Sequence, residues 1–160
     1  MDKRTRVLAA MNGEKVDHVP VGFWFHFGGD EAIGEACVNA HLKYYRETDL
    51  DFVKIMCDGY FPFPLPLIRK AEDWNRVKPL EADDPFITEQ VDRAKAIVKE
   101  IGNERCVFYN VFAPFSSLRF GAGAVGLSEE QVMEHLRSNP NAVMRALDAI
   151  AQSNALLAEK

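Results

Sequence analysis

Apolar residues occur along the chain in two patterns, one with helical spacing and one of short continuous runs. At helical spacing they predict helices over residues 3–12, from about residue 30 to 48, over 85–101, from about Ser128 to Arg137, and from Pro140 to the end. Three other apolar runs are short and lack this spacing: residues 19–27, 51–57 and 106–112. Such runs are typical of strands in a parallel sheet that is covered on both faces.

Strands that alternate with helices predict right-handed crossovers and a parallel α/β sheet. The expected order is one helix followed by three βα units. No linker composition or internal repeat divides the chain, so residues 1–160 are expected to form a single domain. If the sheet belongs to a barrel, the face of the second strand with Lys54 and Asp58 should point into the lumen, because a charged pair under the outer helices would be costly to bury.

Two polar residues lie at or near the ends of their expected strands and are our candidates for catalysis. Asp58 ends the second strand and His26 lies near the end of the first. Active sites of parallel barrels are built at these strand ends, and histidine and carboxylate side chains serve as general acids and bases there. The alternatives are that Asp58 only forms a turn with Gly59 and that His26 is an ordinary pocket histidine.

The remaining candidates would contact a substrate. Four are aromatic and could form one wall of a pocket, although core packing is the commoner use of such side chains: Trp24, Phe61, Phe115 and Phe120. Ser116 follows Pro114 and could open a helix whose backbone N–H groups, with Arg119 nearby, bind an anion. Simple capping of that helix by the serine is the alternative.

Composition and charge argue against several classes of function for this chain. The formal net charge is −5, which argues against a nucleic-acid-binding surface. No apolar run is long enough to cross a membrane, and the charged start does not resemble a signal peptide, so a cytoplasmic location is expected. The three cysteines are scattered and have no metal-ligand spacing, so we expect reduced thiols and no metal bound by this chain.

Several segments, in order along the chain, resemble the uroporphyrinogen decarboxylase superfamily. They are Arg6–Gly13 followed by Asp17–Val21, then Asp51–Ile55 with Asp58, then Glu72–Trp74 with Val77–Leu80, and finally Phe112–Ser116. The resemblance implies the N-terminal portion, about three βα units, of a (β/α)8 TIM barrel with parallel strands. A full barrel needs about 200–250 residues and eight strands, so the chain is expected to be an incomplete barrel.

Only some of the family's site residues have a matching residue in this chain. Its Arg-Gln-Ala-Gly-Arg stretch corresponds to Phe25–Gly29, which keeps one glycine and neither of the arginines that hold substrate carboxylates. The family's aspartate that binds pyrrole N–H groups corresponds to Asp58, and its tyrosine corresponds to Phe120, which has no hydroxyl group. The family's last-unit histidine has no counterpart in this chain.

The resemblance implies an enzyme acting on a small molecule, with this chain alone expected to be inactive. Because the arginines are missing, corrinoid-linked methyl transfer is preferred to true uroporphyrinogen decarboxylation. In the superfamily that chemistry uses zinc, a corrinoid and a corrinoid protein as partner, all of which would belong to the full-length protein. A lyase of tetrapyrrole metabolism is one alternative. A non-catalytic subunit that binds a ligand, a partner or a second copy through open sheet edges is another.

Overall fold

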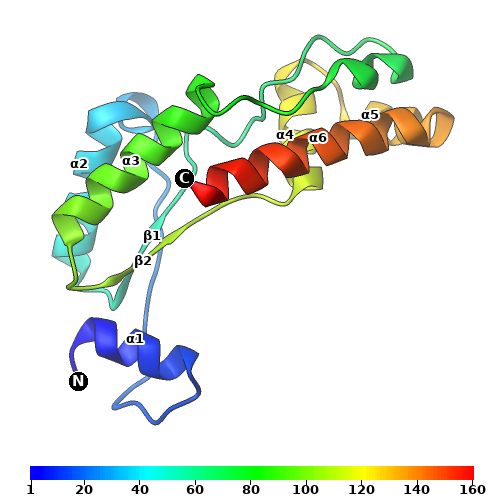
Figure 1. The fold of residues 1–160 in the computed structure, drawn as a ribbon. Coiled ribbons are helices and arrows are strands. Elements are labelled where there is room, and N and C mark those ends of the chain that lie inside the picture. The colour runs from blue at the N-terminus through cyan, green and yellow to red at the C-terminus, as the bar shows by residue number, and fades with distance from the viewer. The chain divides into compact units, whose positions relative to one another are not determined.

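The computed structural model describes all residues from 1 to 160 as a mainly helical chain (Figure 1). The α-helices are α1 (Lys3–Met11), α2 (Gly34–Thr48), α3 (Pro85–Ile101), α4 (Pro114–Ala124), α5 (Glu129–Ser138) and α6 (Pro140–Glu159). Two 3-10 helices, η1 (Gly29–Glu31) and η2 (Ala71–Arg76), interrupt the loops. The only strands are β1 (Phe52–Ile55) and β2 (Cys106–Tyr109).

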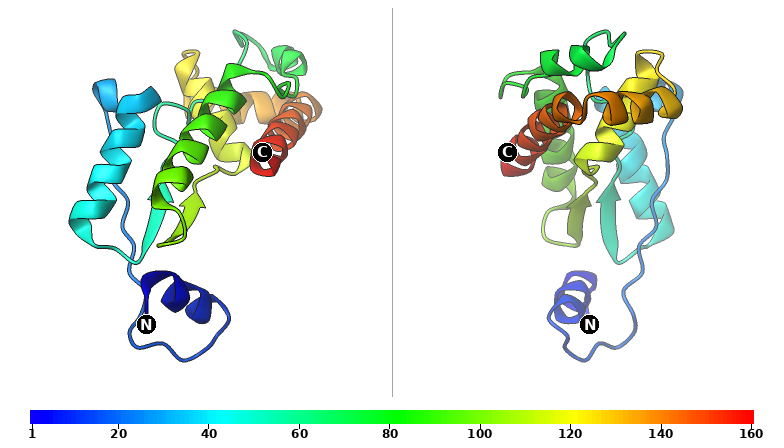
Figure 2. Two further views of the ribbon diagram at one scale, coloured as in Figure 1. Left: turned by 60° about the vertical axis from the view of Figure 1, so that its left-hand side comes forward. Right: turned by 90° about the vertical axis from the view of Figure 1, so that its right-hand side faces the viewer.

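The prediction of three βα units from a TIM barrel is wrong. Only two strands form, each of four residues, and they make a two-stranded parallel sheet (Figure 2). In this sheet Phe52 lies opposite Cys106. The chain is mostly helix, and the expected first strand over residues 19–27 is absent.

Side-chain carboxylates explain why residues 19–27 form no strand. Pro20 has no N–H group, and the N–H groups of Val21 and Phe27 donate to carboxylate oxygens of Asp51 (2.8 Å) and Asp58 (3.1 Å). One backbone–backbone hydrogen bond, of the kind found between strands, remains: the Asp51 N–H donates to the Val21 carbonyl oxygen at 2.8 Å. Backbone donors that bond to side chains cannot also pair with a neighbouring strand.

The chain divides into two compact units, and each is described by itself. The first comprises Met1–Gly59 and Asp92–Asn110, and the second comprises Tyr60–Val91 and Val111–Lys160. The expectation of one domain over residues 1–160 stays a prediction.

The first unit is organised around the two strands. Its core packs side chains of α2, β1 and the end of α3 together: Leu42, Tyr45, Leu50, Val53, Ile55, Ile97 and Ile101. Strand residues 53 and 55 therefore point into this core. At the N-terminal end of the chain, Arg6 of α1 donates to Asp51 at 2.5 Å, and both side chains are buried.

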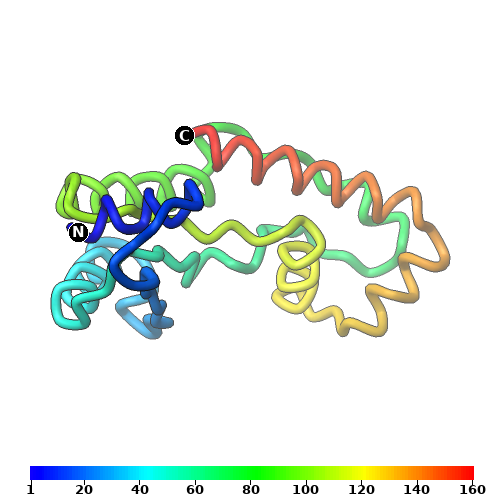
Figure 3. Tube along the Cα trace, turned by 90° about the horizontal axis from the view of Figure 1, so that it is seen from below, coloured from blue at the N-terminus to red at the C-terminus, as the bar shows by residue number.

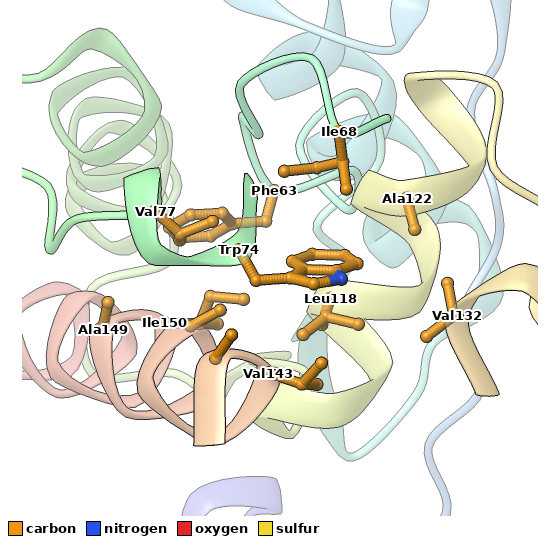
Figure 4. Close-up of a cluster of buried hydrophobic side chains, with 12 residues drawn as sticks. Phe63, Ile68, Trp74, Val77, Leu118, Ala122, Val132, Val143, Ala149 and Ile150 are labelled. Carbon is orange, nitrogen blue, oxygen red and sulfur yellow. The ribbon is translucent and has the colours of Figure 1, made fainter. Parts of the chain in front are cut away.

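The second unit is a helical assembly around one tryptophan. Trp74 of η2 is fully buried among side chains of α4, α5 and α6, with Leu118 and Val143 beside it (Figure 4). Helix α6 runs alongside the segment that contains η2 (Figure 3). The α5 helix begins with a capping box, in which Ser128 and Gln131 each bond to the other's backbone N–H group.

No helix of the structure is long and apolar enough to pass through a bilayer.

Candidate functional site

His26 and Asp58, the two candidate catalytic residues, form a hydrogen-bonded pair in the first unit. Asp58 was expected to end its strand, but β1 ends at Ile55, so Asp58 lies three residues beyond it. The next residue, Gly59, has a positive φ of 81°, which glycine adopts without strain. The Nδ1 atom of His26 lies 2.8 Å from Oδ1 of Asp58. The aspartate side chain is 6% exposed and the histidine side chain is 66% exposed, so a buried carboxylate holds an imidazole at the surface.

Both carboxylate oxygens of Asp58 are used to fix the segment that carries His26. Oδ1 faces the imidazole, and Oδ2 accepts the backbone N–H of Phe27 at 3.1 Å. An ionised carboxylate can only accept hydrogen bonds, so Nδ1 is the ring nitrogen that carries the hydrogen. The lone pair of neutral His26 is therefore on Nε2, which is the atom available for proton transfer.

Arg93 of α3 supports the pair from the buried side. Its guanidinium group donates to the backbone carbonyl oxygen of Asp58 at 2.9 Å and to the hydroxyl of Tyr109 at 2.7 Å, and the residue is 3% exposed. One buried cation thus connects the segment after β1 with the last residue of β2. It also brings a positive charge to the neighbourhood of the buried Asp58 carboxylate.

Sequence analysis missed Arg93, although the chain carries a signal for it. Arg93 precedes Ile97 and Ile101 by four and eight residues, so it shares the inward face of α3. A charged residue at a core position of an amphipathic helix indicates a buried polar partner. Burial also raises the pKa of its partner Tyr109 to about 12, so the tyrosine stays neutral and can accept the hydrogen bond from Arg93.

No cluster of metal-ligating side chains surrounds the thiols of the first unit. Burial raises the pKa of Cys37 and of Cys57, which favours the neutral thiol over the thiolate that binds zinc. No group of three or more His, Cys, Asp or Glu side chains converges anywhere in the chain. The residues present do not fit a zinc ion.

Trp24, a predicted substrate contact, lies against Lys54 in the first unit. The Lys54 ammonium nitrogen is 3.9 Å from the centroid of the Trp24 ring, a cation–π contact. Trp24 is half-exposed. This contact gives Lys54 a structural partner inside the chain.

The other five predicted contacts belong to the second unit. Phe61 and Phe120 pack with ring centroids 5.5 Å apart, and Phe112 completes this aromatic group at 5.2 Å from Phe120. Arg119 forms an ion pair with Glu129 at 2.9 Å, which already balances its charge. Phe115 and Ser116 both lie in the first turn of α4, Phe115 exposed and Ser116 half-buried.

Comparison of the chain with models of known protein families gives no match, and neither curated proteins nor solved structures give one.

Proposed function

We propose that the first unit carries the proton-transfer site of an enzyme that acts on a small molecule. The observation on which this depends is the pairing of exposed His26 with buried Asp58 at 2.8 Å. We further propose that the enzyme is similar to the uroporphyrinogen decarboxylase and corrinoid-dependent methyltransferase superfamily, and that methyl transfer is its chemistry.

The proposed role of His26 is general acid–base catalysis. The carboxylate of Asp58 orients the imidazole and stabilises the imidazolium that forms when Nε2 takes a proton. Exposure of the ring allows a substrate to reach Nε2, while burial of Asp58 protects the orienting hydrogen bond from water.

The surroundings of the pair favour methyl transfer over decarboxylation of a tetrapyrrole. Methyl transfer to a thiol requires removal of the thiol proton, and decarboxylation requires delivery of a proton to carbon, so His26 suits either reaction. A substrate with many carboxylates needs exposed cations, but the two positions that correspond to the superfamily's arginines are occupied by Phe25 and Gly29. Arg93 is buried and occupied by the Asp58 carbonyl oxygen and Tyr109.

The proposal includes cofactors and partners that are not assigned to any residue of this chain. A corrinoid, when bound, would supply the methyl group, and a corrinoid protein would be the partner that delivers it. Because the cysteines and acidic residues here do not converge, we derive no step through zinc. A cytoplasmic location is part of the same proposal.

The test uses the protein encoded by the complete gene. Methyl transfer from methylcobalamin to a thiol is measured by the loss of methylcobalamin absorbance, and uroporphyrinogen decarboxylation is measured in parallel. We expect Asp58→Asn to lower turnover by about 10²–10⁴-fold while the circular dichroism spectrum is retained, because general acid–base catalysis has this magnitude. His18→Ala, at an exposed position, is the matched control. Unchanged kinetics in Asp58→Asn would reduce Asp58 to a turn residue.

A non-catalytic binding subunit is the second candidate, favoured by one observation. The segment before η1 exposes several large apolar side chains, among them Val19, Phe23 and Trp24. A surface of this kind is typical of an interaction site. Self-association would make the sedimentation coefficient depend on concentration, and Phe23→Ser or Phe23→Glu should then remove that dependence without altering any turnover.

A further inference from the structure

The segment that carries His26 has a second face, and this face forms an aromatic hollow in the first unit. Successive residues of an extended segment point to opposite sides. His26 faces Asp58, whereas Phe25 and Phe27 face Tyr44 of α2. The centroids of the three rings are separated by 5.4 Å for Phe25–Phe27, 5.9 Å for Phe25–Tyr44 and 6.3 Å for Phe27–Tyr44.

The three rings are held in place from behind. His41 is buried with its ring centroid 4.6 Å from that of Phe27, and Tyr45 packs edge-on against Tyr44 at 5.1 Å. The backbone N–H of Phe27 is fixed by Asp58. Phe25 nevertheless remains 55% exposed, so one ring of the group still presents its surface to solvent.

Charged side chains complete the hollow, whose volume is about 240 Å³. Glu31 and Glu47 line it together with the three rings, and Lys43 is the single cation in its wall. Two carboxylates against one ammonium group give the wall a net charge of −1. Neither glutamate forms an ion pair within the chain, so both are available to an external cation.

We propose that this hollow binds a methylated ammonium group, such as the trimethylammonium group of a small-molecule or peptide ligand. The faces of aromatic rings carry partial negative charge and attract cations, and methyl groups on nitrogen fit against the same faces without losing hydrogen bonds to water. The wall charge adds long-range attraction for a cation and disfavours anions. The volume suits a head group of this kind and is too small for a large cofactor.

This inference does not depend on the proposed catalytic role of His26. The two features occupy opposite faces of residues 25–27, so either can fail without the other. His26→Ala removes the proton-transfer group and leaves Phe25 and Phe27 in place. We therefore expect this variant to retain ligand binding.

The test is a titration of the whole chain with choline, followed by NMR of the aromatic side chains. Its control ligand is 3,3-dimethylbutan-1-ol, which has the same shape as choline but no charge. We expect choline to shift the resonances of Phe25, Phe27 and Tyr44 and to bind at least about fivefold more tightly than the neutral alcohol, the ratio that corresponds to a cation–π contribution near 1 kcal/mol. Equal binding of the two ligands, or no saturable shift of these rings with choline, would overturn the proposal.

Matched variants separate the rings and charges of the hollow from general surface effects. Phe25→Ala should abolish saturable binding, whereas Phe23→Ala, which removes an equally exposed ring outside the hollow, should leave it unchanged. Glu47→Gln should weaken choline binding and Lys43→Gln should strengthen it, because the wall charge changes in opposite directions. Equal losses in Phe25→Ala and Phe23→Ala would show that choline binds exposed aromatic surface without a defined site.

Discussion

The two units of the chain are stabilised by different chemistry. In the first unit, buried charges connect segments that are far apart in sequence: Arg6 bonds to Asp51, and Arg93 bonds to the backbone of Asp58. In the second unit, the core is apolar and centred on Trp74. The unit with the buried charges is also the one that contains the candidate site.

This difference shows which interactions fix the orientation of a side chain and which only fill the core. Apolar contacts are non-directional, so a core like that of the second unit fixes volume more strongly than orientation. Hydrogen bonds to charged groups are directional, and Asp58 uses both oxygens to set the position of residues 26 and 27. A side chain that must transfer a proton needs the second kind of support.

The largest effect that we expect is in the apolar core of the second unit. Trp74→Ala should lower the free energy of unfolding by about 3–5 kcal/mol, because it removes a fully buried ring and leaves a cavity. The indole N–H also donates to His135 at 3.2 Å, and this bond is lost too. Urea denaturation followed by circular dichroism measures the change. Met144→Ala on the exposed face of α6 is the control, and a similar loss there would contradict the assignment of Trp74 as the centre of the core.

A smaller effect should distinguish two glycines of the same helix in that unit. A methyl group on Gly121 would lie 2.6 Å from the backbone oxygen of Phe63, whereas one on Gly123 meets nothing within 4 Å. Gly121→Ala should therefore destabilise the protein by about 1–3 kcal/mol through overpacking. Gly123→Ala should stabilise it by about 0.5–1 kcal/mol, because alanine favours helix more than glycine does. Thermal denaturation of both variants is the measurement, and shifts of the same sign would refute the close approach at Gly121.

The glycines of α4 also show one limit of the sequence analysis. The glycines of residues 121–126 favour a flexible loop, but α4 continues to Ala124. Glycine disfavours helix when local propensity alone is considered. Here the absence of a side chain at Gly121 allows the helix to approach the Phe63 backbone, and that tertiary contact is invisible in the local pattern.

Helices with regular spacing and clear ends were predictable. The expected helix over residues 85–101 coincides with α3, and α5 begins at Glu129 behind its Ser128 cap. The hydrophobic period and the capping residues are local signals, so they do not depend on the rest of the fold. The second unit owes much of its structure to such signals.

The first unit was harder to predict because its long-range polar bonds decide the structure. The run over residues 19–27 is as apolar as a buried strand, yet Asp51 and Asp58 bind its backbone N–H groups. An aspartate that accepts from the backbone 30 residues away leaves no local signal. The same bonds place His26 beside Asp58, so the candidate residues were proposed from the sequence while the reason for their proximity was not.

The smallest effect that we predict concerns acid and is specific to the first unit. Burial, reinforced by the positive charge of Arg93, lowers the pKa of His41, although its hydrogen bond to the Cys37 carbonyl oxygen works in the opposite direction. Below its ordinary pKa of about 6.5 the unfolded chain binds a proton that the folded chain resists, so stability is full above that pH and falls as the pH decreases toward the lowered value. Urea unfolding, monitored through Trp24 in a Trp74→Phe background, should show this loss in the first unit as the pH falls below about 6.5. His41→Gln should remove the slope in this range. If the free energy of unfolding of that variant still depends on pH in this range, His41 is not the buried group that makes the first unit more sensitive to acid.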